Sequence, residues 1–233
     1  MGKRIIQQRR GAGGPVYRVR DKANLNDRIG YPNDLSGEYK VVKLISSPGH
    51  SAPIAKFVNS KNQFFYNFAV NLLYVGQTIQ IGGSNNGDVT CLKDLKNGTK
   101  VFNIEQRSKD GGKYIRVAGT HGIISNQDNG IVTITMPSKK DKKFSELCRA
   151  TVGIVAGDGR LEKPIMRAGK QYYIMKSKSK LWPRTSAVSM NKVDHPFGSG
   201  RGKNIKSKIA KRNASPGKKV GLIRPRRTGR KKR

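Results

Sequence analysis

The sequence predicts a mainly β fold, either one sandwich or two small barrels, carried between two basic extensions. Short runs rich in β-branched and aromatic residues, separated by Gly, Asn and Pro turns, fill residues 38–155. We find no pattern of a helix of any length, and the β-rich region suits small all-β units. The Gly- and Asn-rich break at 82–88 interrupts this region and favours two units.

Each expected strand is a β-rich run that ends at turn residues. The first run, Glu38–Ser46, is β-branched and stops at the turn Ser47–Gly49. Lys96–Gly98 has the composition of a hairpin-like turn. Ile131–Met136 alternates cleanly after a turn at Asn126–Gly130. The expected strands are 38–46, 55–58, 63–70, 77–81, 91–95, 100–105, 113–117, 122–125, 131–136 and 150–155.

The charge of the chain predicts a polyanionic partner. The chain has 48 Lys and Arg against 14 Asp and Glu, a formal net charge of +34 and an isoelectric point near 10.6. Residues 151–233 hold 24 basic and 3 acidic residues, whereas residues 36–150 hold 16 and 8. Such a chain repels itself unless its charge is neutralised. We therefore expect nucleic acid as its partner.

An anionic membrane surface is the alternative partner for so basic a chain. That partner requires an amphipathic helix with an apolar face, and the sequence has no such pattern. The longest nearly apolar stretch, Phe68–Val75, is too short to span a bilayer. The N-terminal residues lack the apolar core of a signal peptide. We therefore expect a cytoplasmic protein with no membrane partner.

The C-terminal segment is the most basic part of the chain. From His195 onward, 39 residues hold 15 Lys or Arg and no acidic residue. Segments with so few apolar residues do not order themselves, and glycine lets a backbone approach phosphate closely. We expect residues 1–35 and roughly 165–233 to be protease-sensitive in the free protein and to take shape on a polyanion.

Few residues suit catalysis or metal binding. Cys91 and Cys148 lie 57 residues apart without CxxC spacing, so we expect buried thiols rather than zinc ligands or a disulfide. The carboxylates form no cluster suited to Mg²⁺, and the three histidines are widely spaced. Gly198–Lys203 lacks the spacing and flanking elements of a phosphate loop. We expect no cofactor, no metal and no enzymatic activity.

A series of motifs gives the chain a family resemblance that runs nearly end to end. The motifs are QRRGAG at 8–13, SPGHSAPIAK at 47–56, DGGKYIRVAG at 110–119, CRATVGIVAGDGRLEKPIMRAGK at 148–170, LWPR at 181–184, MNKVDHPFGSG at 190–200, SPGKKVGLI at 215–223 and RRTGR at 226–230. The chain resembles the second protein of the large ribosomal subunit, the L two family, in its archaeal or eukaryotic-cytoplasmic form. This resemblance implies a basic extension over 1–35, an OB-fold barrel over 36–87, an SH3-like barrel over 88–165 and a basic extension over 166–233.

The same resemblance implies a structural constituent of the large ribosomal subunit. Its extensions would contact large-subunit ribosomal RNA, neighbouring ribosomal proteins and, through inter-subunit contacts, the small subunit. One loop would lie toward the peptidyl transferase region, with Met190, Asn191, Asp194, His195 and Pro196. The alternative is a general nucleic-acid-compacting protein that binds by charge alone. Such a protein needs neither ordered Gly and Pro turns nor a loop with one fixed histidine.

The candidate RNA contacts are basic residues and the aromatic residues among them. Arg149 and Arg160 flank a strand and a Gly-rich turn, where backbone N–H groups can approach phosphate. Arg116 is either a contact or a solvated charge. Tyr172–Tyr173 and Trp182 stand among lysines, and Trp182 either stacks on an unpaired base or packs the extension. The candidates are Arg9, Arg10, Arg18, Arg116, Arg149, Arg160, Lys163, Arg167, Lys170, Lys176, Lys178, Lys180, Trp182, Arg184, Asn191, His195, Arg201, Lys218, Arg226 and Arg227.

His195 is the one candidate with two different roles. Its neighbour Asp194 could orient the imidazole, whose usual pKa suits proton transfer. A catalytic histidine also needs a dry, shaped pocket, and no other acid, base or nucleophile is near in sequence. Pro196 restricts the backbone before it, as a preformed loop requires. We therefore expect His195 to contact RNA and shape the loop.

Overall fold

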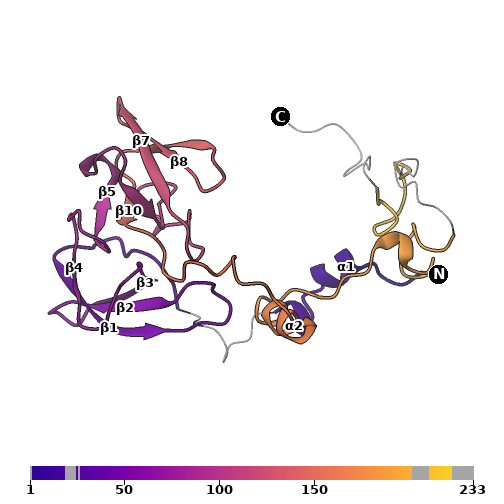
Figure 1. Ribbon diagram of the computed structural model, residues 1–233. Coiled ribbons are helices and arrows are strands. Elements are labelled where there is room, and N and C mark those ends of the chain that lie inside the picture. The colour runs from indigo at the N-terminus through magenta and orange to yellow at the C-terminus, as the bar shows by residue number, and fades with distance from the viewer. Residues whose placement is uncertain (1, 19–24, 26, 201–209, 222–233) are drawn as a thin grey trace. The chain divides into compact units, whose positions relative to one another are not determined.

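The computed structural model describes residues 2–18, 25, 27–200 and 210–221, and its chain forms two compact units (Figure 1). The sheet unit is Arg20–Arg167 and contains all the described strands. The extension unit joins Met1–Val19 to Ala168–Arg233 and contains both described α-helices. Two segments from opposite ends of the chain therefore share one unit.

The first sheet of the sheet unit is antiparallel, with strand order β3-β2-β1-β4. Its strands are β1 (Glu38–Ile45), β2 (Ile54–Val58), β3 (Phe64–Phe68) and β4 (Thr78–Gln80). These strands are rich in β-branched and aromatic residues, which pack well on a pleated surface. The register of β1 against β2 shifts between Val41 and Lys43. Such a bulge bends the strand and increases its twist.

The second sheet is also antiparallel, with strand order β5-β10-β6-β7-β8-β9. Its strands are β5 (Val89–Cys91), β6 (Lys100–Phe102), β7 (Gly122–Asp128), β8 (Ile131–Thr135), β9 (Asp141–Ser145) and β10 (Arg149–Val152). Strands β6 to β9 are neighbours in order, and β10 returns to pair with both β5 and β6. Strand β10, the last described strand in the chain, therefore lies between β5 and β6 in this sheet.

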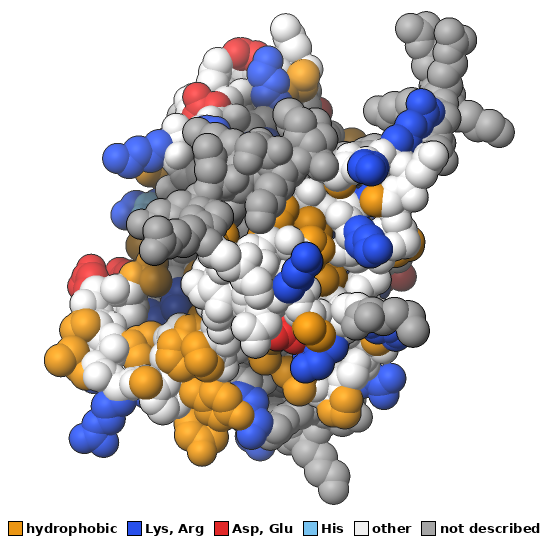
Figure 2. All heavy atoms as spheres, turned by 90° about the vertical axis from the view of Figure 1, so that its right-hand side faces the viewer, with side chains coloured by type: hydrophobic (Ala, Val, Ile, Leu, Met, Phe, Trp, Pro, Cys, Tyr) orange, Lys and Arg blue, Asp and Glu red, His pale blue; other side chains and the backbone are white. Residues whose placement is uncertain are grey.

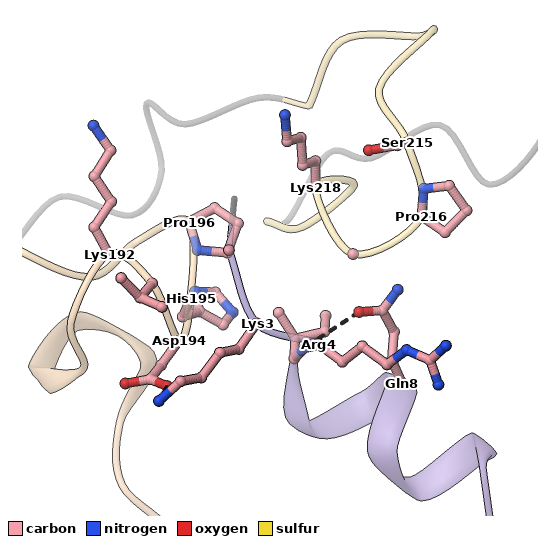
Figure 3. Close-up of a pocket in the computed structure, with 14 residues that line it drawn as sticks. Lys3, Arg4, Gln8, Lys192, Asp194, His195, Pro196, Ser215, Pro216 and Lys218 are labelled. Atoms are coloured by element: carbon pink, nitrogen blue, oxygen red, sulfur yellow. Dashed lines mark hydrogen bonds and ion pairs between the residues drawn. The ribbon is translucent and has the colours of Figure 1, made fainter.

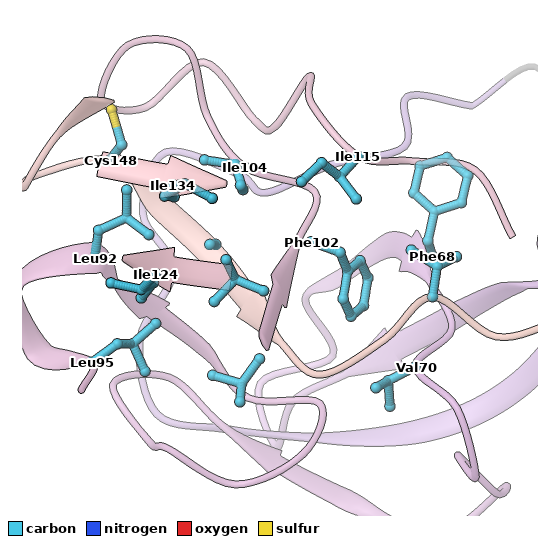
Figure 4. Packing of buried hydrophobic residues seen from close by; sticks show 14 of the residues in the cluster. Phe68, Val70, Leu92, Leu95, Phe102, Ile104, Ile115, Ile124, Ile134 and Cys148 are labelled. Atoms are coloured by element: carbon cyan, nitrogen blue, oxygen red, sulfur yellow. The ribbon is translucent and has the colours of Figure 1, made fainter. Parts of the chain in front are cut away.

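The larger hydrophobic cluster joins the two sheets (Figure 4). Phe68 and Val70, at the end of β3, belong to the same cluster as Phe102 and Ile104 of the second sheet region. Each large apolar side chain buried in this way contributes about 1.5–3 kcal/mol. A smaller cluster lies on the first sheet and consists of Tyr39, Val41, Ala55, Phe57, Phe65, Ala69 and Ile79.

A buried chain of polar side chains also links the two sheets. The Tyr31 hydroxyl shares a hydrogen bond of 2.6 Å with Thr151 Oγ1, and the Asn67 amide donates to the same oxygen at 2.9 Å. The Asn103 amide donates to Asn67 Oδ1 at 2.8 Å. All four side chains are buried, and burial raises the pKa of the Tyr31 phenol. Loss of one member leaves its partners buried without a hydrogen bond.

The mainly β prediction is confirmed, and the structure corrects several details. The predicted strand 91–95 is wrong, because β5 ends at Cys91 and a 3₁₀ helix, Leu92–Asp94, follows. Lys96–Gly98 is therefore no hairpin turn between paired strands, since β5 and β6 both pair with β10.

One further strand prediction and one turn prediction are corrected by backbone conformation, whereas the predicted strand 122–125 lies within β7. The run 113–117 is no strand, because Ile115 has a φ of 56° and only Tyr114 makes a single bridge, to Ile104. Strand β7 continues to Asp128, so the expected turn at 126–130 shrinks to Asn129 and Gly130, which have φ values of 47° and 77°. Strand β9 was missed altogether, because Phe144 is the one buried residue among its five.

The expectation of no helix is wrong for the extension unit. Helix α1 is Ile6–Gly11 and helix α2 is Ala168–Ser177, with short 3₁₀ helices at Pro15–Tyr17 and Ala187–Ser189. Helix α2 has no buried residue, so it lacks the apolar stripe that reveals a helix in sequence. The thiols are free, as expected, although Cys148 is buried and Cys91 only partly so.

Candidate nucleic-acid interface

The loop around His195 is folded on itself by backbone hydrogen bonds. The amides of Asp194 and His195 both donate to the Asn191 carbonyl, at 3.0 and 3.2 Å. The Gly198 amide donates to the His195 carbonyl at 2.9 Å, and the Ser199 amide to Met190 at 3.0 Å. Residues 190–200 therefore form a compact loop held by hydrogen bonds between their own backbone groups.

Gly198 and Phe197 fix the shape of this loop. A Cβ on Gly198 would overlap the carbonyl oxygens of Met190 and Asn191, so the turn closes only around glycine. Phe197 is buried, and its ring lies 5.2 Å from the His195 ring, centroid to centroid, at 61°. The aromatic pair anchors the imidazole on one side.

The hydrogen bonds of His195 favour a positioning role. Its Nδ1 accepts a hydrogen bond of 3.1 Å from the Phe197 amide. Burial lowers the pKa of the imidazole, which favours the neutral ring. A neutral ring that accepts at Nδ1 carries its proton on Nε2. His195 therefore offers one N–H donor to a partner.

Asp194 does not orient the imidazole, contrary to the alternative considered from sequence. Its carboxylate forms an ion pair with Lys3 Nζ at 3.6 Å. The Lys3 amide donates to the Val193 carbonyl at 2.8 Å. The N-terminal segment is thus attached to the loop by two contacts, and among the described residues His195 has no acidic hydrogen-bond partner.

A hollow of about 830 Å³ opens between this loop and two other segments of the extension unit (Figure 3). Its walls come from residues 2–5 with Gln8, from 192–196 and from 215–218. The Gln8 side chain accepts a hydrogen bond of 3.1 Å from the Ile5 amide at the start of α1. A Cβ on Gly217 would lie 2.6 Å from Gln8 Oε1, so glycine lets the third segment approach.

The hollow is strongly basic. Lys3, Arg4, Lys192 and Lys218 line it, and Asp194 is the single acid among the lining residues. Such a concentration of cations around a concave surface attracts and holds an anion. Lys218 was predicted from sequence, but the three other cations were missed. No local pattern could reveal them, because segments from opposite ends of the chain form the walls.

A second basic place in the extension unit is a small cavity of about 260 Å³. Arg10, Lys180 and Arg184 line it, together with Ile6, Tyr17, Ser179 and Leu181. The Ser179 hydroxyl donates to the Arg18 carbonyl at 2.8 Å, which ties the N-terminal segment to the end of α2. The fold thus brings three predicted contacts together.

Helix α2 presents an aromatic pair beside a lysine. The Tyr172 and Tyr173 rings lie 5.4 Å apart at 78°, and both are exposed. Lys176 Nζ lies 5.6 and 5.9 Å from the two ring centroids. Exposed rings among cations are the usual platform for an unpaired base. Trp182 is half-buried, which is compatible both with stacking on an unpaired base and with packing of the extension.

Arg149 has its charge neutralised inside the sheet unit. Its guanidinium donates to Glu105 Oε1 at 2.7 Å and to the Pro32 carbonyl at 2.8 Å. Glu105 is fully buried and also accepts from the backbone amides of Lys109, Gly111 and Arg149. This buried ion pair fixes the loop after β6. A contact between Arg149 and RNA stays a prediction.

Arg116 is likewise held within the sheet unit. Its guanidinium donates to the Ile29 carbonyl at 3.0 Å and lies 4.7 Å from the centre of the Phe68 ring. Burial lowers the pKa of the guanidinium. Arg116 is therefore not the solvated charge that formed the alternative to RNA contact, and its RNA contact stays a prediction.

The other predicted contacts are spread over exposed surface. On the face shown in Figure 2, Lys and Arg side chains lie at many separate points, with few acidic ones. Arg9, Arg10, Arg18, Arg160, Lys163, Arg167, Lys170, Lys176, Lys178, Lys180, Arg184, Asn191 and Lys218 are exposed. Arg201, Arg226 and Arg227 lie outside the described residues.

Proteins of similar sequence indicate the family to which this chain belongs. Residues 85–217, more than half of the chain, match the family "Ribosomal Proteins L2, C-terminal domain". The protein "Large ribosomal subunit protein uL2" of Archaeoglobus fulgidus is 41% identical over 238 residues, covering 98% of this chain and 99% of the relative. Its namesake from Hyperthermus butylicus is 43% identical over 240 residues, covering all of both chains. The chain belongs to the uL2 family.

Membership of the uL2 family confirms the resemblance drawn from the sequence motifs. It identifies the chain as a structural ribosomal protein rather than an enzyme. Among the described residues, no three His, Cys, Asp or Glu side chains gather into a possible metal site. None of the helices in the same part of the chain is long and apolar enough to cross a membrane.

Proposed function

We propose that this uL2 chain binds large-subunit ribosomal RNA through its extension unit and supports the architecture around the peptidyl transferase centre. The observation that carries this proposal is the hollow lined by Lys3, Arg4, Lys192 and Lys218 beside the preformed loop of His195. Cations position a phosphate backbone, and a neutral imidazole N–H can donate to a phosphate, a 2′-hydroxyl or a base edge.

We also propose that neighbouring ribosomal proteins and the small subunit meet the surfaces that RNA leaves free. The finer fold assignment belongs to the same proposal, with an OB-fold barrel over 36–87 and an SH3-like barrel over 88–165. The bulge in β1 supports the first, because bulges give a sheet the bend that closure requires. The return of β10 between β5 and β6 supports the second.

The alternative, a protein that compacts nucleic acid by charge alone, is less well supported. The loop 190–200 is closed by four backbone hydrogen bonds around a glycine that tolerates no side chain. A partner bound only by charge requires no such shape. The preformed loop therefore favours recognition of a folded RNA.

Washing of ribosomes from the source cell tests the proposal. We expect the chain to remain with the large subunit through washes at high salt, because shape and stacking supplement the electrostatic attraction. In competition assays, large-subunit RNA should displace duplex DNA of equal length from the purified chain. Release in the first wash, with equal affinity for DNA, would favour the compacting protein instead.

Replacement of His195 separates positioning from catalysis. Gln keeps hydrogen-bonding capacity but takes up no proton at neutral pH. We expect His195→Gln ribosomes to form peptide bonds within about tenfold of the normal rate, whereas loss of a general base costs roughly 10²–10⁴-fold. His195→Ala, which removes the donor, should impair incorporation of the chain into subunits or subunit joining.

Single-turnover peptidyl transfer on fully assembled subunits measures this effect. His121→Gln, which alters a histidine of the sheet unit, is the matched control and should leave the rate unchanged. A loss of a thousandfold or more in His195→Gln ribosomes with normal occupancy of the chain would overturn the positioning role.

A further inference from the structure

One face of the first sheet combines lysines and aromatic rings, although no candidate contact was predicted there. The strand register sets Lys43 opposite Lys56 and Lys56 opposite Tyr66. Two residues farther along β2, Val58 pairs with Lys40 on one side and with Phe64 on the other. We name Lys40, Lys43, Lys56, Phe64 and Tyr66 the aromatic–lysine face.

The rest of the sheet unit covers only part of this face. Lys40, Lys43 and Phe64 are exposed, whereas Lys56 and Tyr66 are half-buried and Tyr66 packs against the larger cluster. Alternate residues of the same strands, such as Phe57 and Phe65, point the other way into the smaller hydrophobic cluster. Further along, Ile54 and Phe68 are covered by the second sheet as part of the larger cluster. Phe64 itself is 55% exposed. A large ring with that exposure contributes little to the core.

The aromatic rings of this face stand next to a cation. Lys56 Nζ lies 4.5 Å from the centre of the Phe64 ring, and the Phe64 and Tyr66 rings lie 5.9 Å apart at 76°. Burial and the nearby Asp27 carboxylate raise the pKa of the Tyr66 phenol, so it stays uncharged at neutral pH. Phe64 therefore offers an exposed ring beside the Lys56 ammonium group.

A cavity of about 300 Å³ lies against the same two rings. Its other walls are formed by Phe65 and by the segment with Asp27, Arg28, Gly30, Tyr31 and Pro32, so one basic and one acidic side chain line it. Its volume is at the lower end of the range for pockets that hold small ligands. The Arg28 guanidinium donates to a backbone carbonyl at 3.3 Å and is exposed, so it remains accessible to an anion.

We propose that the aromatic–lysine face binds an unpaired RNA base, which stacks on Phe64 while the lysines meet the flanking phosphates. The identity of the polymer as RNA rests on the proposed function, but this site lies apart from the hollow of the extension unit. The charge of this face favours a nucleic acid over a protein partner, because its three lysines match the negative charge of a sugar–phosphate backbone. An apolar protein partner requires a larger continuous apolar patch than the Phe64 ring and the half-buried Tyr66 ring provide.

A fluorescent reporter in the full chain tests this site. The chain has one tryptophan, Trp182, so Trp182→Phe combined with Phe64→Trp leaves a single indole at the proposed site. Titration with a single-stranded oligouridine should quench this indole by about half or more, since bases stack on indole rings. Tyr74→Trp in the same background is the matched control, because Tyr74 is a comparably exposed ring outside the lysine rows. It should show no comparable quenching.

Lysine substitutions test the phosphate contacts. Lys43→Gln together with Lys56→Gln should shift the midpoint of quenching to higher RNA concentration by roughly tenfold. The salt slope of the midpoint should fall by about 1.4, or about 0.7 for each phosphate that the variant no longer neutralises. In the unaltered chain, photo-crosslinking with 5-bromouridine in the oligonucleotide should modify Phe64 or Tyr66.

The outcomes separate this inference from the proposed function. No quenching and no crosslink, while the chain still binds large-subunit RNA, would overturn the site and leave the proposed function intact. Equal quenching by a fully paired duplex would also overturn it, because a duplex offers no free base. Protection of the indole only by another ribosomal protein would assign the face to a protein partner instead. Failure of the chain to bind any ribosomal RNA would remove the proposed function as well.

Discussion

The affinity of this chain for large-subunit RNA should fall by roughly 10³–10⁵ when salt is raised from 50 to 200 mM, if it makes six to ten phosphate contacts. The reason is release of condensed counterions from the RNA, which salt opposes. The hollow alone presents four cations against one acid, and the small cavity near α2 adds three more. The number of contacts required is thus within reach of the described residues.

Filter binding or fluorescence anisotropy over a salt series measures this slope. Lys3→Gln and Lys218→Gln should each lower it by about 0.7–0.9, whereas Lys61→Gln, in an exposed loop of the first sheet, should leave it unchanged. A slope near zero for the unaltered chain would refute the electrostatic basis of binding.

Removal of the Glu105 carboxylate should destabilise the sheet unit by about 3–5 kcal/mol, because it leaves a buried guanidinium without its counter-charge. Arg149 donates to Glu105 with two guanidinium nitrogens, at 3.1 and 2.7 Å, and three backbone amides donate to the same carboxylate. Glu105→Ala leaves all these donors unpaired. Glu105→Gln keeps a carbonyl oxygen with two acceptor lone pairs, so it should destabilise the sheet unit less than Glu105→Ala does.

Urea unfolding followed by far-ultraviolet circular dichroism gives the free energy of unfolding of each variant. Glu162→Ala, which removes an exposed glutamate, is the control and should change stability by no more than about 0.5 kcal/mol. If Glu105→Ala and Glu162→Ala unfold at the same urea concentration, the buried ion pair contributes nothing to the fold.

The elements that could be predicted from sequence are those with a local signal. Ile131–Thr135 alternates apolar and polar residues, and β8 lies within one residue of the predicted run. Strand β9 has charged residues at three of its five positions, so its pairing with β8 rather than its own composition makes it a strand. Helix α2 has no buried residue and carries no clear apolar stripe.

The candidate site was predictable only in part for a similar reason. His195 and Lys218 stand in recognisable basic, Gly-rich sequence, and the order of motifs identified the family. The partners of these residues come from far away in the chain, as Lys3 does for Asp194. Glu105 and Arg149 are 44 residues apart, so nothing local shows that one neutralises the other.

The hydrogen bond between Tyr31 and Thr151 spans 120 residues, and the backbone bond from Lys3 to Val193 spans more. A chain that grows from its N-terminus cannot make either contact until the distant partner has been synthesised. The sheet unit is therefore completed only when β10 emerges, and the basic hollow only after residue 218. During synthesis the hollow that we propose binds RNA does not yet exist, so this chain acquires its main RNA-binding shape as one of the last events of its own production.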